Sequence, residues 1–160
     1  MTKEIKSVFI AGAGTIGCSM GQAFAKYGYD VTLYDIFDTA LERAKSIINI
    51  NQQTEVANGN ISKEDSNALT ERIHFTGDIN EFKDADFVVE AVLEKMEVKH
   101  DFWSKVSEIV DEDVILTSNT SGLSITKIAE AIKKPERFAG MHWINPPHII
   151  PLIEVIKGEK

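Results

Sequence analysis

A glycine-rich turn between an apolar segment and a helical segment is the feature that most constrains this chain. Residues 7–11 form an apolar run, and Gly12, Gly14 and Gly17 follow it with the spacing G-x-G-x-x-G. This spacing alone is a weak signal, but here the turn follows a strand pattern and opens a helix pattern. In such a unit the three glycines allow a tight turn, a close approach of a phosphate to the backbone, and close packing of helix on strand. We therefore expect an α/β domain with a phosphate-binding turn.

One acidic residue indicates which dinucleotide such a turn would bind. Asp35 ends the predicted strand 31–35 and follows Gly17 by 18 residues, and no Lys or Arg comes directly after it. A carboxylate there accepts hydrogen bonds from ribose hydroxyls and repels a 2′-phosphate. Ile36 and Phe37 suit the face of an adenine ring, and the helix N-terminus attracts the pyrophosphate. The sequence predicts NAD rather than NADP as cofactor; the alternative is a purely structural glycine turn.

Apolar runs alternate with helical patterns along the chain, which is typical of a mostly parallel sheet covered by helices. Strands are expected at residues 7–11, 31–35, 73–75, 87–89, 114–116, 137–141 and 152–156. Asp38 is the expected N-cap of a helix after the second strand, and Ser62 with Asp65 forms the expected capping box of another. A further helix is expected over residues 125–132, ended by Pro135. We predict one Rossmann-type, doubly wound domain over residues 1–160, with a helical hairpin inserted after the second strand.

Charge and cysteine content exclude several classes of partner. The chain has 17 Lys and Arg against 25 Asp and Glu, a net charge of −8, and no basic run, which argues against nucleic acid. No signal segment or apolar run long enough for a membrane span is present. The single cysteine, Cys18, favours a reducing compartment, so a cytoplasmic location is expected, and no metal site is predicted. Cys18 lies in the first helical turn, where we expect it to pack behind the glycine turn rather than to react.

Polar residues in the second half are candidates for chemistry. His142 and His148 follow a predicted strand, where open α/β sheets bind their ligands. Glu154 lies in the apolar segment 152–156, and a buried carboxylate needs a partner, so a histidine is expected beside it to be fixed in one tautomer. Hydroxyl and amide side chains cluster at residues 117–122; they are either the N-cap of the next helix or contacts to a substrate, and the spacing leaves both open.

Four blocks of sequence carry a resemblance to a known family. They are Gly12 to Gly17, Val89 to Glu94, Ser118 to Ser121, and Arg137 to His142 with Asn145 and Pro146. In these blocks, and over essentially its whole length, the chain resembles the L-3-hydroxyacyl-CoA dehydrogenases, which include the 3-hydroxybutyryl-CoA dehydrogenases. The resemblance implies an NAD-dependent oxidoreductase of fatty acid metabolism. Its reaction would oxidise the 3-hydroxyl of an L-3-hydroxyacyl-CoA to the 3-oxoacyl-CoA, or reverse this.

The resemblance also implies roles for particular residues. His142 would be the general base, Glu154 its orienting carboxylate, and Ser121 a hydrogen-bond partner of the substrate 3-oxygen, with Asn145 also in the substrate site. His148 falls outside the motif. Glu94, Lys99 and Asn119 match positions on the nicotinamide-ribose side of the cofactor. The full set of implied cofactor-binding residues is Gly12, Gly14, Thr15, Ile16, Gly17, Asp35, Ala91, Glu94, Lys99 and Asn119.

Family members have a second, all-helical domain after this point, and that domain is absent from this chain. It supplies their dimer interface, so the full-length protein is expected to be a homodimer through it, and the chain alone is expected to bind NAD without turnover. A small molecule is the expected partner.

Two departures from the family pattern concern the substrate. Residues 46–61, in the expected hairpin, contain no Lys or Arg, whereas the fatty-acyl enzymes have basic residues there that bind the phosphates of CoA. The segment from Pro146 to Pro151 resembles relatives that act on free 3-hydroxy acids, such as carnitine and gulonate dehydrogenases. A dehydrogenase of a free small 3-hydroxy acid is therefore one alternative. The other is a non-catalytic NAD-binding subunit, which would need no pair of His142 and Glu154.

Overall fold

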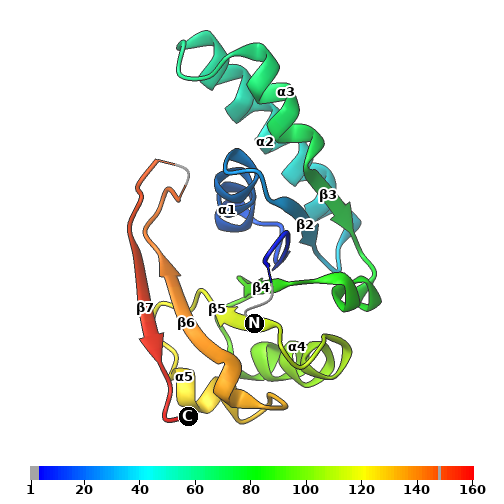
Figure 1. The fold of residues 1–160 in the computed structure, drawn as a ribbon, viewed down its shortest axis with the longest axis vertical. Coiled ribbons are helices and arrows are strands. Elements are labelled where there is room, and N and C mark those ends of the chain that lie inside the picture. The colour runs from blue at the N-terminus through cyan, green and yellow to red at the C-terminus, as the bar shows by residue number, and fades with distance from the viewer. Residues whose placement is uncertain (1–3, 148) are drawn as a thin grey trace.

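The computed structural model describes residues 4–147 and 149–160 and has a single sheet of seven strands at its centre (Figure 1). The strands lie in the order β3-β2-β1-β4-β5-β6-β7. Their bounds are β1 Ser7–Ala11, β2 Asp30–Tyr34, β3 Ile73–Thr76, β4 Phe87–Glu90, β5 Ile115–Ser118, β6 Phe138–Trp143 and β7 Ile153–Lys157. All neighbouring pairs are parallel except β6 and β7, which are antiparallel. The strands β2 and β3 lie on one side of β1, and β4 to β7 lie on its other side. The predicted doubly wound, mostly parallel sheet is therefore confirmed.

Helices cover both faces of this sheet. They are α1 Thr15–Lys26, α2 Asp38–Ala57, α3 Lys63–Glu71, α4 Met96–Ile109 and α5 Ile125–Ala129, with 3-10 helices η1 Ile79–Asp84 and η2 Pro135–Arg137. Helices α2 and α3 form the expected hairpin, which projects past the sheet at the top of Figure 1. Within residues 4–147 and 149–160, every helix is too short or too polar to cross a lipid bilayer.

The alternation of side chains in β1 shows why the core has two halves. Val8 and Ile10 pack into the cluster that includes residues of α1 and α2, whereas Phe9 and Ala11 pack into the cluster that includes residues of α4. All four are buried, because successive side chains of a strand point to opposite faces and both faces are covered. Each fully buried aliphatic or aromatic side chain contributes roughly 1.5–3 kcal/mol to stability. The core therefore fixes the sheet from which the loops of the site extend.

Two predicted helix boundaries were wrong and one cap was right. Phe37, not Asp38, is the N-cap of α2, and Asp38 is its first helical residue, where a carboxylate still interacts favourably with the helix dipole. Ser62 caps α3 as predicted, since its Oγ accepts a hydrogen bond from Asp65 N at 3.0 Å. Helix α5 ends at Ala129 instead of residue 132. After Ala129 the chain continues in tighter turns, in which the N–H of Ile132 donates to the carbonyl oxygen of Ala129, three residues back.

The last strand is also not the buried strand that the sequence indicated. Every residue of β7 is exposed, including Val155, because β7 pairs only with β6 and lies at the edge of the sheet. The side chain of Glu154 is 60% exposed, so the expectation that it is a buried carboxylate was wrong. A run of aliphatic residues does not by itself distinguish a covered strand from an edge strand.

Candidate active site

The glycine turn is built as its spacing predicts. A Cβ atom on Gly17 would lie 1.9 Å from the carbonyl oxygen of Gly12, and one on Gly12, where φ is +104°, would lie 2.4 Å from the carbonyl oxygen of Ala91. A Cβ on Gly14 would meet nothing within 4 Å. Thus Gly12 and Gly17 are required by contacts within the protein, whereas Gly14 opens onto free space.

The free space above Gly14 fits the pyrophosphate of a dinucleotide. Gly14 is the N-cap of α1 without any side-chain cap, and the first turn contains no acidic residue. The first N–H groups of a helix, here those that include Thr15 and Ile16, have no partner within the helix and favour an anion. Both residues were predicted to contact the cofactor, and they lie in this first turn.

Asp35 is fixed directly beside the turn. Its Oδ2 accepts a hydrogen bond from Ala13 N at 3.0 Å, and its Oδ1 accepts one from Phe37 N at 3.1 Å. Ile36 and Phe37 are 70% and 62% exposed, as the adenine side of a cofactor site requires. The carboxylate follows the last residue of β2, so it lies at the carboxyl end of the sheet near the glycine turn.

Cys18 packs behind the turn and does not have the properties of a reactive thiol. It is fully buried, and its Sγ donates to the carbonyl oxygen of Ala13 at 3.5 Å. Burial raises the pKa of the thiol from its usual 9.0 to about 11, and the backbone hydrogen bond offsets only part of this. The packing role expected from the sequence is confirmed.

Three predicted residues lie in a line on the side of the sheet that ends with β5, β6 and β7. The Oγ of Ser121 lies 3.2 Å from Nε2 of His142, and Nδ1 of the same ring lies 2.7 Å from Oε2 of Glu154. Ser121 belongs to the loop after β5, and the other two are on the adjacent strands β6 and β7. A carboxylate on Nδ1 favours the tautomer in which that nitrogen carries the proton and Nε2 is free to accept one. This arrangement is suited to general base chemistry at Nε2.

Glu94 orders the loop that carries Ser121. Its Oε1 accepts hydrogen bonds from Ser121 N at 3.0 Å and Gly122 N at 3.4 Å, and from the hydroxyl of Thr120. Burial acts to raise the pKa of Glu94, but the Thr120 hydroxyl, the Lys99 ammonium and the Ser121 N–H together lower it below its usual value. Glu94 is therefore held as an acceptor for this loop.

The side chains of Asn119 and Lys99 are both fixed by contacts within the protein, a hydrogen bond for Asn119 and two ion pairs for Lys99. Oδ1 of Asn119 accepts a hydrogen bond from Trp143 N at 2.9 Å, which joins the loop after β5 to β6. The ammonium of Lys99 is 1% exposed and lies 2.5 Å from Glu90 and 3.1 Å from Glu94. Sequence reasoning gave Glu90 no role, although an acidic residue at the end of an apolar strand was the signal that could have revealed it.

The structure narrows the interpretation of the polar cluster at residues 117–122. The N-cap of α5 is Ser124, whose Oγ accepts from Lys127 N at 3.3 Å, so no residue of the cluster has that role. The remaining predicted residues are Ala91 and Asn145, which follow the carboxyl ends of β4 and β6. Ala91 donates from its N to the carbonyl oxygen of Ala11 at 2.7 Å, and Asn145 is exposed just after β6. His148 lies outside the described residues.

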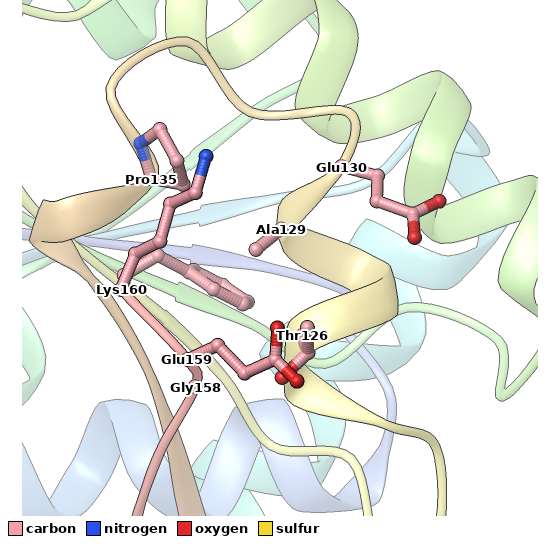
Figure 2. A pocket seen from close by; sticks show the side chains of 8 residues that line it. Thr126, Ala129, Glu130, Pro135, Gly158, Glu159 and Lys160 are labelled. Carbon is pink, nitrogen blue, oxygen red and sulfur yellow. The ribbon is translucent and has the colours of Figure 1, made fainter.

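A cavity of about 210 Å³ lies away from this site (Figure 2). It is lined by residues of α5, η2 and the chain after β7, among them Thr126, Ala129 and Lys160. It contains none of the predicted site residues. Among residues 4–147 and 149–160, no group of three or more His, Cys, Asp or Glu side chains could hold a metal ion.

Comparison with known proteins places this geometry in a family. The family model described as "3-hydroxyacyl-CoA dehydrogenase, NAD binding domain" matches residues 7–160. A relative from Mesorhizobium japonicum, 5-formyl-3-hydroxy-2-methylpyridine 4-carboxylate 5-dehydrogenase, is 41% identical over 98% of this chain and 50% of its own. The 3-hydroxyadipyl-CoA dehydrogenase of Escherichia coli K12 is 37% identical over 99% of this chain and 33% of its own.

A solved structure agrees with these relatives. The crystal structure of 3-hydroxybutyryl-CoA dehydrogenase from Escherichia coli K12 superposes with a TM-score of 0.95 at 36% identity, covering 98% of this chain and 33% of that one. The chain thus spans half or less of the length of these three proteins. The family match over nearly all residues, together with the glycine turn and Asp35, identifies the cofactor as NAD. The chain belongs to the family of 3-hydroxyacyl-CoA dehydrogenase NAD-binding domains.

Proposed function

We propose that the whole protein oxidises the 3-hydroxyl of an L-3-hydroxyacyl-CoA with NAD, or reduces the 3-oxo group in reverse. The observation that carries this proposal is the line from Ser121 Oγ through His142 to Glu154, with distances of 3.2 and 2.7 Å. Ser121 follows the carboxyl end of β5 and His142 is the second-last residue of β6, so the line lies at the carboxyl ends of these strands, where open α/β sheets bind ligands. A subunit that only binds NAD has no need of this arrangement.

The proposed mechanism assigns one task to each residue. Nε2 of His142 accepts the proton of the 3-hydroxyl, a contribution typically worth about 10²–10⁴-fold. Glu154 keeps the ring in the accepting tautomer and stabilises the imidazolium that forms. Ser121 donates a hydrogen bond to the oxygen as it becomes a carbonyl. NAD, when bound, supplies the acceptor for the hydride.

The same proposal assigns the cofactor contacts. The pyrophosphate is assigned to the glycine turn and the first turn of α1, which contain Gly12, Gly14, Thr15, Ile16 and Gly17. Asp35 lies where it can accept hydrogen bonds from the adenosine ribose. The nicotinamide side is assigned to Ala91, Glu94 and Asn119, and the buried Lys99 is assigned to it through Glu94. Asn145, exposed beside the site, is assigned to the substrate.

A second candidate substrate is a free small hydroxy acid. Residues 46–57 of α2 carry no Lys or Arg, so this part of the helix offers no cation to the phosphates of a CoA. The Mesorhizobium relative is named for a pyridine carboxylate rather than a CoA thioester. Both candidates use the same base and the same cofactor, so the difference concerns only what lies beyond the reacting carbon.

An assay with a panel of substrates tests both candidates. The rate of NAD reduction by the whole protein is compared for 3-hydroxybutyryl-CoA, free 3-hydroxybutyrate, carnitine and gulonate. We expect the thioester to have the largest kcat/KM. A larger value for a free acid would establish the second candidate, and no turnover of any of them would contradict the proposed function.

The described residues alone leave the reacting groups open to water. Ser121 is exposed, and the side chain of Glu154 is 60% exposed. Hydride transfer needs reacting atoms held about 3–3.5 Å apart, and a misplacement of 1 Å can cost about 10²-fold. We therefore propose that this 160-residue chain binds NAD with negligible turnover, and that the second domain expected from the family encloses the site in the whole protein. The homodimer and the cytoplasmic location stay predictions.

A further inference from the structure

A buried ion pair lies beneath the loop that carries Ser121. Glu90, the last residue of β4, is 0% exposed, and Lys99, on α4, is 1% exposed. Their side chains meet at 2.5 Å. Pairing two charges in a protein interior is costly in desolvation, so a gain in stability alone does not account for this pair.

Glu90 connects the two strand ends that border the site. Its Oε1 accepts hydrogen bonds from Lys99 and from Val92 N at 3.0 Å, in the loop after β4. Its Oε2 accepts one from Ser118 Oγ at 2.7 Å, at the end of β5. Ser118 Oγ in turn accepts from Thr120 N at 3.3 Å. One buried carboxylate therefore fixes both loops relative to each other.

Lys99 carries the connection outward to Glu94. Its ammonium lies 3.1 Å from Oε2 of Glu94, while the other oxygen of Glu94 accepts the N–H groups of Ser121 and Gly122. The side chain of Glu94 is 45% exposed, so without a cation beneath it only its hydrogen bonds from residues 120–122 would oppose a turn of this carboxylate toward water. Its Oε1 would then no longer accept hydrogen bonds from the N–H groups of Ser121 and Gly122.

We propose that Glu90 and Lys99 are positioning residues that, through Glu94, hold the hydroxyl of Ser121 at reacting distance from His142. The inference rests on the proposed function for its kinetic consequence only. The network ends at a contact of 3.2 Å between Ser121 Oγ and Nε2 of His142. Neither buried residue touches the substrate; each acts through Glu94.

The double variant Glu90→Gln/Lys99→Met separates this role from stability. Gln at position 90 can still accept from Val92 N and donate to Ser118 Oγ, and Met fills the volume of the lysine chain without its charge. We expect the fold to be retained while Glu94 loses its cation. The control is Lys105→Met, which removes an ion pair from the exposed face of the same helix, where Lys105 lies 2.8 Å from Asp101.

In the whole protein, we expect the double variant to lose about 10²-fold in kcat, the loss that a displacement of about 1 Å produces. The KM for the hydroxy substrate stays near that of the parent, since groups that bind the rest of the substrate are untouched. The Lys105→Met control keeps both parameters. A double variant that folds with a parental melting temperature and keeps the parental kcat would overturn the proposal.

Hydrogen exchange of the Ser121 and Gly122 amides gives a result that does not depend on activity. We expect both amides to exchange faster in the double variant than in the parent and in Lys105→Met, because their acceptor has moved. If the double variant does not fold, Glu94→Ala is measured instead, since it leaves the buried pair intact, and unchanged protection there overturns the proposal. A parent protein without dehydrogenase activity would contradict the proposed function, while the exchange result would still decide on the network.

Discussion

His142 and Glu154 are directly opposite each other in the antiparallel pair of β6 and β7, and their side chains meet at 2.7 Å. The strand pairing places both side chains at the same level of the sheet, so carboxylate and imidazole meet within one pair of strands. Side chains on directly opposed residues of an antiparallel pair have Cβ atoms about 4.5–5.5 Å apart, within reach of such a bond. The hairpin thus orients the proposed base before any substrate arrives.

Replacing the proposed base tests the assignment of the histidine. We expect His142→Ala in the whole protein to lower kcat by about 10²–10⁴-fold, the usual worth of a positioned base, with little change in NAD affinity. Steady-state kinetics and calorimetry measure the two quantities. The matched variant is His148→Ala, which should keep most of the activity. A greater loss in that variant than in His142→Ala would mean that the wrong histidine was chosen.

The orienting carboxylate should matter less than the base. In Glu154→Gln, the amide can still contact Nδ1 but carries no charge to stabilise the imidazolium. We expect kcat to fall, by less than in His142→Ala, and the melting temperature to stay near that of the parent, since β7 is an exposed edge strand. Lys157→Gln, in the same exposed strand, is the control. Equal kcat in Glu154→Gln and the control would contradict the role of the carboxylate.

Asp35 is expected to set the preference for NAD over NADP. Its carboxylate would meet a 2′-phosphate with like charge, so the parent should bind NADP far more weakly. In Asp35→Asn, lost hydrogen bonds to a charged group cost about 1.5–3 kcal/mol, which weakens NAD roughly tenfold or more. NADP should bind more tightly to the variant than to the parent, because the like charge opposite its 2′-phosphate is gone, so the gap between the two cofactors narrows. Titration calorimetry with both cofactors measures this, and equal affinities in the parent would refute it.

The raised pKa of Cys18 predicts a dependence of stability on pH. The folded thiol keeps its proton up to about pH 11, whereas the unfolded thiol loses it near 9.0. Above pH 9.0 the unfolded state therefore binds fewer protons, and the free energy of unfolding falls as the pH rises. Cys18→Ala should show a shallower fall over this range in denaturant titrations. Identical slopes in parent and variant would contradict the prediction.

The sheet and the cofactor side were predictable because their signals are local. The glycine turn, the alternation of apolar runs and Asp35 each follow from contacts within one strand–turn–helix unit and the strand after it. The family resemblance implied the pair of His142 and Glu154, whereas the residues alone predicted only that some histidine lies beside Glu154. The reason taken from the residues, a buried carboxylate, was wrong, because Glu154 is largely exposed and the register of β6 and β7 brings the pair together.

The buried network was not predictable in the same way. Glu90 and Lys99 are on different elements, and their contact depends on how α4 packs over the ends of β4 and β5. A single chain gives the residue types but not this packing. The exposure of β7 was missed for a related reason, since it depends on which neighbours cover this segment rather than on its own composition.

A pair of glycine variants separates the needs of the fold from the needs of the cofactor. Gly17→Ala places a Cβ 1.9 Å from a backbone oxygen of Gly12, and a backbone atom cannot yield as a flexible side chain can. The close packing of α1 on β1 must open, so we expect a clear fall in melting temperature and lost NAD binding together.

Gly14→Ala should behave differently. Its new Cβ meets no protein atom within 4 Å, so the melting temperature should stay near that of the parent or rise slightly, since alanine restricts the unfolded chain. The methyl group would, however, extend into the space where the pyrophosphate approaches the helix N-terminus. We therefore expect NAD affinity to fall sharply in a protein that remains folded, as measured by calorimetry beside a thermal melt. Parental affinity in Gly14→Ala would mean that the cofactor does not approach the backbone here, and the assignment of this turn to the pyrophosphate would have to be abandoned.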